Sequence, residues 1–382
     1  MSFGVAAPQI AKRPSSSDSQ SVKDTVANSF SPKRVLSGVR PTGKLHLGNY
    51  MGALYNWVKL QNEVDENGAS KYECYFFIAD WHALTTDYAD PSQVPQNTLD
   101  VALDYLAAGL TPDKSVLFVQ SHVLEHAELH LLLSMLTPLG WLERVPTYKE
   151  QQENITGKDL STYGFLGYPL LQSADILLYQ PDFVPVGQDQ VAHVELTREV
   201  ARRFNFMYQK RLAPGQADIL PEPQVLLTPS PKLPGTDGRK MSKSYGNTIL
   251  LSDPADVIRQ KLKPMVTDPA RVRRKDPGDP DKCPVGDLHK VFSSAEVMAR
   301  VYEGCRTAGI GCLECKGWAA DSIIAALEPI QERRATYETN PKLVQEVLDD
   351  GKERATRRAE QTMIEVREVM GMKRMLVGEA VS

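Results

Sequence analysis

The sequence predicts an α/β fold, with a doubly wound parallel sheet in its N-terminal part and an all-helical region after it. Two patterns predict the sheet: short apolar runs such as residues 74–79, which are typical of buried parallel strands, and helical stretches that alternate with them. The 382 residues, 42% of them apolar, are enough for two domains with a substantial core. We therefore expect an α/β domain over residues 34–245 and a helical domain over residues 246–376.

The first elements follow each other closely along the chain. Residues 35–38 form an apolar strand that ends in glycine, and helix 48–64 follows with Met51, Leu54 and Val58 on its apolar side. The other elements expected in this part are, in order, strand 74–79, helix 97–108, strand 115–120, helix 125–139, a flexible polar loop over 151–161, helix 163–179, a short strand and turn at 184–190 and helix 191–204. Beyond residue 246, strand patterns are scarce, and amphipathic helices are expected at 321–336 and 341–370.

Composition and charge limit the kinds of protein that this sequence can encode. No apolar run approaches the roughly 20 residues needed to span a bilayer, so we expect no membrane role. The formal net charge of -4 does not attract phosphate over the whole molecule. Any nucleic-acid surface must therefore be a local patch, and no DNA binding is expected.

Residues 1–33 are rich in Ser, Pro, Lys and Gln, and we expect them to be a disordered extension. An organelle transit peptide is the alternative, because Lys12, Arg13 and Lys23 lie among many serines, although Asp18 and Asp24 oppose it. We expect a cytoplasmic protein, with an organellar location as the alternative.

Two stretches far apart in the sequence have the chemistry of a polyphosphate site. Residues 37–50 read as a strand end, a Gly/Pro turn and a helix start, the geometry that seats phosphates on helix N-terminal amides. Residues 235–245 form a basic loop in which Lys240 and Lys243 are suited to hold a polyphosphate as charge develops on it. Taken alone, this second stretch could also be a solvated surface loop.

These two stretches also resemble a known family. His46-Leu47-Gly48-Asn49 and Lys240-Met241-Ser242-Lys243-Ser244 resemble the two signatures of the class I aminoacyl-tRNA synthetases, in the right order. Other runs closely resemble the tryptophanyl-tRNA synthetases of the bacterial type: Tyr168-Pro169, Ala174-Asp175-Ile176-Leu177, Val184-Pro185-Val186-Gly187, Asp189-Gln190 and Glu195-Leu196-Thr197-Arg198. The resemblance covers residues 35–375 and implies a Rossmann-like catalytic domain followed by a helical anticodon-binding domain.

The resemblance implies a homodimer that activates L-tryptophan with ATP and transfers it to tRNA(Trp). ATP and Mg²⁺ are the implied cofactors, and no carboxylate cage for Mg²⁺ is visible in the sequence. The implied catalytic residues are His46, Asn49, Lys240 and Lys243. The implied ATP-binding residues are Arg40, Thr42, Gly48, Asn49, Gly187, Asp189, Lys240, Met241, Ser242, Lys243 and Ser244.

Asp175 lies in the middle of an apolar helical run, where a carboxylate without a partner would be costly. Either it accepts a structural hydrogen bond from a neighbouring helix or it faces a ligand that donates one, and the resemblance favours the indole N–H of tryptophan. His82 follows the strand at 74–79 and is either a pocket residue or a structural histidine. The expected tryptophan-binding residues are Asp175, Tyr168, Gln172, His82, Gln190 and Val186.

Two positions depart from the commonest pattern of the family, because Gln172 stands where many relatives have methionine and Arg40 where many have glutamine. Gln172 resembles the tyrosyl enzymes, so a tyrosyl-tRNA synthetase is the first alternative. A synthetase-like tRNA-binding protein without catalysis is the second, although both nucleotide stretches are intact. The third, another nucleotidyltransferase of the same superfamily, would not need a helical C-terminal domain.

Four of the five cysteines fall in the expected helical domain with the spacing C-x21-C-x6-C-x2-C: Cys283, Cys305, Cys312 and Cys315. Such a set suits tetrahedral Zn²⁺ or an iron–sulfur cluster, brought together by a flexible loop at residues 309–311. Only one short C-x2-C hook is present, which favours the cluster. The resemblance to a subset of the bacterial-type enzymes likewise implies [4Fe-4S], with Zn²⁺ or unrelated free thiols as the alternatives.

Residues 271–275, Arg-Val-Arg-Arg-Lys, form a basic cluster in the helical region. A charge run of this kind is usually a solvated face. In a chain that handles tRNA, it could equally contact phosphates.

Overall fold

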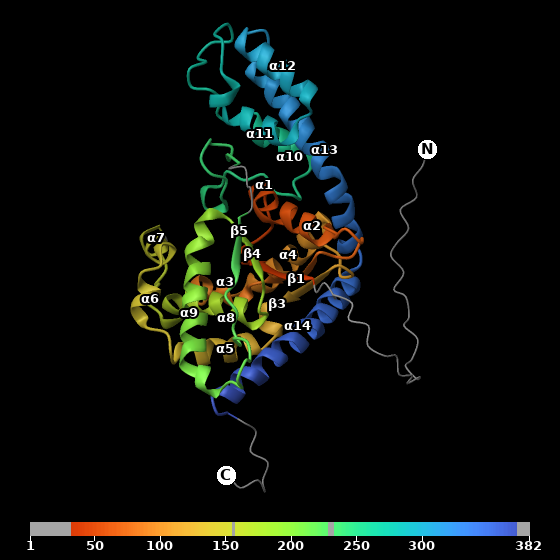
Figure 1. Cartoon of the computed structure of the whole chain (residues 1–382). Coiled ribbons are helices and arrows are strands. Elements are labelled where there is room, and N and C mark those ends of the chain that lie inside the picture. Colours follow the sequence, from red (N-terminus) through yellow and green to blue (C-terminus); the bar gives the residue numbers. More distant parts are fainter. Residues whose placement is uncertain (1–31, 155–156, 228–232, 373–382) are drawn as a thin grey trace, which may run out of the picture. The chain divides into compact units, whose positions relative to one another are not determined.

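Five parallel strands form a sheet in the order β3-β2-β1-β4-β5 (Figure 1). The strands are β1 (Lys33–Val39), β2 (Tyr72–Ile78), β3 (Ser115–Val119), β4 (Phe183–Val186) and β5 (Gln224–Leu227). The order runs outward in one direction from β1 and in the other from β4, which is the doubly wound arrangement that the sequence predicts. The topological switch point between β1 and β4 is where such sheets bind ligands, outside the carboxyl ends of their strands.

The computed structural model describes residues 32–154, 157–227 and 233–372, and the expectations for residues 1–31 lie outside them. These described residues belong to one compact unit. The helices of the α/β part are α1 (Leu47–Asn49), α2 (Tyr55–Asn62), α3 (Asp80–Asp87), α4 (Val94–Ala108), α5 (Glu125–Ser134), α6 (Leu139–Glu143), α7 (Pro146–Asn154), α8 (Tyr163–Leu178) and α9 (Val191–Tyr208). Those of the helical part are α10 (Ala255–Leu262), α11 (Pro284–Phe292), α12 (Ala295–Arg306), α13 (Cys312–Glu338) and α14 (Pro341–Val369).

Both faces of the sheet are buried, which explains why its central strands read as continuous apolar runs. Successive side chains point to opposite faces, so Val35 belongs to one apolar cluster and the next residue, Leu36, to the other. Side chains of α2, α4 and α13 fill the first cluster, where Trp57 stacks on Phe76 with ring centroids 4.7 Å apart. Side chains of α5, α8, α9 and α14 fill the second.

Helix α14 packs directly on β3, an outer strand of the sheet (Figure 1). A Cβ atom placed on Gly351 of this helix would lie 1.7 Å from the backbone oxygen of Leu117 in β3. Only glycine allows the two backbones to come this close. The C-terminal helix is therefore part of the same core as the sheet.

Three local predictions are wrong, and one strand was not predicted. Helix α5 ends at Ser134 rather than at residue 139, where α6 begins. Helix α7 continues to Asn154, so residues 151–154 are not a loop, and their polar composition gives no apolar period to reveal the helix. Strand β5 was not expected, because it has only four residues, none of them fully buried. Helix α13 begins at Cys312 rather than at residue 321. The boundary at residue 245 between two domains stays a prediction.

No helix within residues 32–154, 157–227 and 233–372 has both the length and the apolar character needed to cross a membrane.

Candidate active site

His46 and Asn49 cap the start of α1, just beyond the carboxyl end of β1. The Nδ1 atom of His46 accepts from the backbone N–H of Asn49 at 3.3 Å, and the Asn49 Oδ1 atom accepts from the backbone N–H of His46 at 3.2 Å. This reciprocal pair is a capping box, which satisfies backbone donors that the helix itself leaves free. The helix start expected in the first loop, residues 40–49, is confirmed.

The cap also fixes the chemistry of the His46 ring. Burial, together with the charges of Lys243 and Lys240, lowers the pKa of His46 to about 4. The ring is therefore neutral at pH 7, and because Nδ1 accepts a hydrogen bond, the proton must be on Nε2. Nε2–H is then a donor available to a phosphate oxygen.

Backbone hydrogen bonds join the first loop to the segment that follows the lysine loop, residues 235–247. The N–H of Leu47 donates to the carbonyl of Ile249 at 2.9 Å, and the N–H of Leu251 donates to the carbonyl of Leu45 at 3.0 Å. His46 and Leu250 form an antiparallel bridge between these two bonds. The structure thus brings together the two stretches that the sequence predicted to share a polyphosphate.

Lys243 reaches back to the first loop. Its Nζ atom donates to the carbonyl of Gly43 at 2.7 Å and to that of Thr42 at 3.2 Å. Burial lowers the pKa of Lys243 to about 8, while the charges of Asp104 and Asp100 act in the opposite direction. Lys240 and Ser244 are exposed, Ser242 is half-buried and Met241 is buried, so the lysine loop holds one side chain in the core and offers polar groups on both sides of it.

Asn247 holds the lysine loop in shape, a role that no sequence signal indicated. Its Oδ1 atom accepts from the N–H of Ser242 at 2.8 Å, and its Nδ2 atom donates to Asp237 Oδ1 at 2.7 Å. A Cβ atom on Gly235 would lie 2.2 Å from the Nδ2 of Asn247, so a glycine is required beside it. Asn247 lies outside the signature at residues 240–244, so the signature does not predict its contacts, and only the structure shows them.

Asp175 of α8 is fully buried and lies at the centre of a hydrogen-bond network. It accepts from His82 Nε2 at 2.9 Å, from His126 Nδ1 at 2.7 Å and from Gln120 Nε2, which is 2.8 Å from each carboxylate oxygen. Although burial acts to raise the pKa of Asp175, the hydrogen bonds and charges of His126 and His82 hold it well below its ordinary value. Asp175 is thus an anion whose partners come from α3, α5 and the residues after β3.

Two expected tryptophan-binding residues, Asp175 and His82, are therefore in direct contact, and a third, Tyr168, belongs to a neighbouring polar chain. The Tyr168 hydroxyl is 3.1 Å from Thr147 Oγ1, which is 2.5 Å from His193 Nε2. Gln172 and Val186 are half-buried. The side-chain amide of Gln190 donates to Asp189 at 3.3 Å. At Gly187, an added Cβ atom would lie 2.9 Å from Asp189 Oδ1.

Arg40 stands at the carboxyl end of β1 with an incompletely satisfied guanidinium group. Its Nη2 atom donates to Thr86 Oγ1 at 2.8 Å, and its buried Nε atom has no hydrogen-bond partner among the described residues. Burial lowers the pKa of Arg40, against the charges of Asp87 and Tyr168. A half-buried cation whose buried Nε–H has no partner among the described residues is suited to bind an anionic ligand group.

The four cysteines of the C-terminal part lie near one another. Burial, and then the thiols of Cys283, Cys305 and Cys312, raises the pKa of Cys315 to about 12. All four are free, and Cys312 and Cys315 lie in the first turn of α13, not in a loop. In the described parts of the chain, however, no three His, Cys, Asp or Glu side chains are arranged to hold a metal ion.

Arg271 is the one member of the basic cluster that does not face solvent. It is buried, its Nη2 atom donates to the carbonyls of Arg274 at 2.9 Å and Ile310 at 2.6 Å, and its Nη1 atom lies 3.8 Å from Cys305 Sγ. Its charge serves the folding of the segment around the cysteines. Arg273, Arg274 and Lys275 are exposed.

A doubly wound sheet, with a first loop capped by histidine and asparagine and joined by backbone hydrogen bonds to the segment after a loop that carries two lysines, is the arrangement expected of a class I aminoacyl-tRNA synthetase. The model of the family "tRNA synthetases class I (W and Y)" matches residues 29–328, and the chain belongs to this family.

Individual relatives can be aligned with nearly the whole chain. It is 51% identical over 340 residues to the tryptophan–tRNA ligase of Thermotoga maritima and 49% identical over 403 residues to that of Ralstonia nicotianae; each alignment covers 89% of this chain and 99% of the relative. Among solved structures, the tryptophanyl-tRNA synthetase of Campylobacter jejuni, complexed with ADP and tryptophan, has a TM-score of 0.77 and 32% identity. That alignment covers 88% of this chain and 99% of the other.

Proposed function

We propose that this chain is a tryptophan–tRNA ligase, which activates L-tryptophan with ATP and transfers the tryptophanyl group to tRNA(Trp). The observation that carries the proposal is the backbone pairing of the first loop with the segment after the lysine loop, because it brings together two distant stretches that have the chemistry to bind phosphate. The names of the relatives favour tryptophan over tyrosine.

In the proposed reaction the tryptophan carboxylate attacks the α-phosphate of ATP and pyrophosphate leaves. The protein supplies position and charge rather than covalent chemistry. His46, as the neutral Nε2–H tautomer, donates to a phosphate oxygen, and the Lys243 ammonium group leaves the carbonyls of Gly43 and Thr42 for the departing pyrophosphate. Arg40 uses its free Nε–H on the carboxylate or on the α-phosphate.

We propose that Mg²⁺ enters with ATP and is held mainly by phosphate oxygens. Mg²⁺ keeps several waters and commonly needs only one or two protein ligands in such sites.

Asp175 supports selection of the indole ring. Gln120 Nε2 lies 2.8 Å from both oxygens of Asp175, so one of these two contacts is redundant. An indole N–H can replace it while His82 and His126 hold the carboxylate in place. The structural hydrogen bonds of Asp175 are those of the first interpretation that the sequence left open. The second, in which an indole N–H binds this fully buried carboxylate, requires the ligand to displace the Gln120 contact and stays a proposal.

The first experiment is ATP–pyrophosphate exchange with each of the amino acids in turn. We expect exchange with tryptophan alone. Exchange with tyrosine would give the activity of the alternative tyrosyl enzyme. No exchange with any amino acid, in a protein that still binds tRNA, would contradict catalysis altogether.

We also propose that Cys283, Cys305, Cys312 and Cys315 hold a [4Fe-4S] cluster that acts structurally or in tRNA recognition. The support for this proposal is the chemistry of the donors: all four thiols are free, three of them raise the pKa of Cys315, and Arg271 lies beside Cys305. Binding a cluster would require these side chains to rearrange, because no three of them are arranged to hold a metal ion in the described part of the chain. Protein purified without oxygen should contain about four irons per chain, and Cys315→Ser should lose them while Cys74→Ser, outside the set, keeps them. Stoichiometric zinc instead of iron would contradict the cluster, and a metal-free folded protein would contradict the site.

A homodimer is the proposed state of assembly. Leu131 of helix α5 and Met135, the residue that caps its C-terminus, form an exposed apolar stripe, with Leu124 before the helix and Leu139 after it. Such a stripe on a soluble protein marks an interaction surface, and a second copy is the occupant that the family implies. Sedimentation velocity decides between one and two chains.

A further inference from the structure

A buried arginine joins the end of α13 to α4. Arg334 is 4% exposed; its Nη2 atom donates to Asp100 at 2.8 Å, its Nε atom donates to Glu338 at 2.8 Å, and its Nη1 atom donates to Asp104. Asp104 is 1% exposed. Removing one partner from a buried ion pair leaves an uncompensated charge, so this arrangement holds the two helices in one position.

The same Asp104 also holds the first loop. Its Oδ1 atom accepts from Arg334, while its Oδ2 atom accepts from the backbone N–H of Leu45 at 2.8 Å. Leu45 directly precedes His46, and its carbonyl accepts from Leu251 beyond the lysine loop. One carboxylate therefore ties α13, α4 and the two nucleotide loops together.

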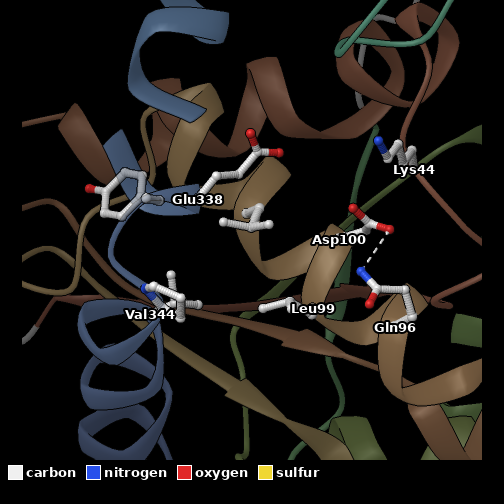
Figure 2. A pocket seen from close by; sticks show the side chains of 9 residues that line it. Lys44, Gln96, Leu99, Asp100, Glu338 and Val344 are labelled. Carbon is white, nitrogen blue, oxygen red and sulfur yellow. Dashed lines mark hydrogen bonds between the residues drawn. The ribbon is translucent and has the colours of Figure 1, made fainter. Parts of the chain in front are cut away.

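Asp100 differs from Asp104 in ways that make it a matched comparison. It lies one turn earlier on α4 and also accepts from Arg334, but it makes no hydrogen bond to the first loop within the described residues. Figure 2 shows it beside a cavity of about 460 Å³, together with Lys44, Gln96 and Glu338. Asp100 is 8% exposed and lines this cavity, whereas Asp104 is 1% exposed and is not among the lining residues.

We propose that Asp104 and Arg334 are positioning residues for the first loop: through the Leu45 N–H they set the place of His46, and they make that place depend on how α13 is seated. This proposal rests on the proposed activation of tryptophan. Neither residue is proposed to touch a substrate. Helix α13 has Cys312 and Cys315 in its first turn and Arg334 near its C-terminal end. A change at the cysteine end can therefore reach the nucleotide loops through this one helix.

A misplacement of about 1 Å at a reacting group can cost about 10²-fold in rate, even when the mutation lies outside the chemistry. We therefore expect Asp104→Asn and Arg334→Gln each to lower kcat/KM for ATP by up to about 100-fold in tryptophan-dependent pyrophosphate exchange, with KM for tryptophan unchanged. Because the two residues act as a pair, the double variant should lose no more than the worse single variant.

Asp100→Asn is the matched comparison: like Asp104→Asn it removes a carboxylate from Arg334 and a negative charge that acts on Lys243, but it removes no hydrogen bond to the first loop. We therefore expect it to lower kcat/KM for ATP clearly less than Asp104→Asn does. Arg333→Gln controls for the loss of a charge on the same turn of α13, because the Arg333 side chain donates to the Ala107 carbonyl and not to either aspartate.

Wild-type exchange with unchanged kcat/KM for ATP in Asp104→Asn and Arg334→Gln, and only a lower melting temperature, would overturn the proposal and leave the pair a structural one. Equal losses in Asp100→Asn would overturn it as well. If Asp104→Asn does not fold, Arg334→Gln carries the same comparison. Absence of exchange in the wild-type chain would instead contradict the proposed function.

Discussion

The environment of Lys243 disfavours the charged form of its side chain. The ammonium group is half-buried against two backbone carbonyls, and burial lowers its pKa to about 8. A leaving pyrophosphate offers stronger acceptors than these carbonyls. The side chain is thus poised to transfer to the phosphate as charge develops.

Lys243→Ala is expected to fold normally and to lower the rate of tryptophan-dependent pyrophosphate exchange by about 10²–10³, the typical value of one preorganised interaction with a transition state. Exchange at the wild-type rate would show that the lysine loop does not act on the phosphates.

The pKa of Lys243 makes a separate prediction about pH. Because the pKa is lowered, the group is charged below pH 8 and neutral above it, so kcat/KM for ATP should fall as pH rises through about 8. Lys243→Arg should lose this falling limb, since arginine stays charged, whatever its absolute rate. A limb that persists in the arginine variant belongs to another group.

Asp175→Asn keeps the size of the side chain and replaces one acceptor by a donor. We expect the variant to lose its discrimination for tryptophan, because a site built around a substrate hydrogen bond rejects analogues lacking that donor by up to about 10⁴–10⁵. Exchange measured with tryptophan and with phenylalanine reports the ratio. Unchanged discrimination with a lower melting temperature would leave Asp175 with only its structural role.

At the scale of elements, two helical glycines make opposite predictions. Gly351 in α14 is pressed against the Leu117 carbonyl, whereas Gly317 in α13 has nothing within 4 Å of its missing Cβ. Gly351→Ala should destabilise the fold by about 1–3 kcal/mol or more through overpacking. Gly317→Ala should stabilise it by about 0.5–1 kcal/mol through helix propensity. Urea unfolding measures both, and equal effects would contradict the close packing of α14 on β3.

The elements that the sequence predicts well are those with a long apolar pattern. Helix α8 ends within one residue of its expected end, and β1, β2 and β3 all lie where their apolar runs lie. Strand β5 was not predicted and part of helix α7 was predicted to be a loop, because a four-residue outer strand and a polar helix show almost no periodic pattern of apolar residues. The predicted start of helix α13 is too late, since cysteines and glycines at its start resemble a loop.

The site is predictable as far as its signatures extend. His46, Asn49 and Lys243 are implied by the resemblance of their stretches to the family signatures, and their roles stay predictions. Their partners Asp104 and Asn247 cannot be predicted, because contacts between distant segments leave no local pattern.

The hydrogen bonding around Asp175 is beyond prediction for the same reason. An apolar helix shows that a carboxylate needs a partner, but it does not show that His82, His126 and Gln120 supply it.

For the molecule as a whole, a net charge of -4 leaves tRNA binding to local patches. Arg273→Ala with Arg274→Ala removes two exposed cations and should weaken tRNA binding, with exchange unaffected. The slope of log affinity against log salt should become shallower by about 0.7–0.9 for each phosphate that is no longer neutralised. Arg271 is kept in this variant because it is buried beside Cys305. An unchanged salt slope would mean that the exposed arginines only face solvent.

The packing of Gly351 on Leu117 also has a consequence in time. During synthesis, β3 leaves the ribosome long before α14 exists, because Gly351 is added about 230 residues later, which takes about 10–50 s at about 5–20 residues per second. Until then the outer edge of β3 lacks its covering helix, and an uncovered strand edge can pair with another chain. Nascent chains halted before α14 and then released should therefore aggregate and sediment on centrifugation, while chains halted after it should stay in solution. This protein is thus exposed to aggregation for most of its own translation.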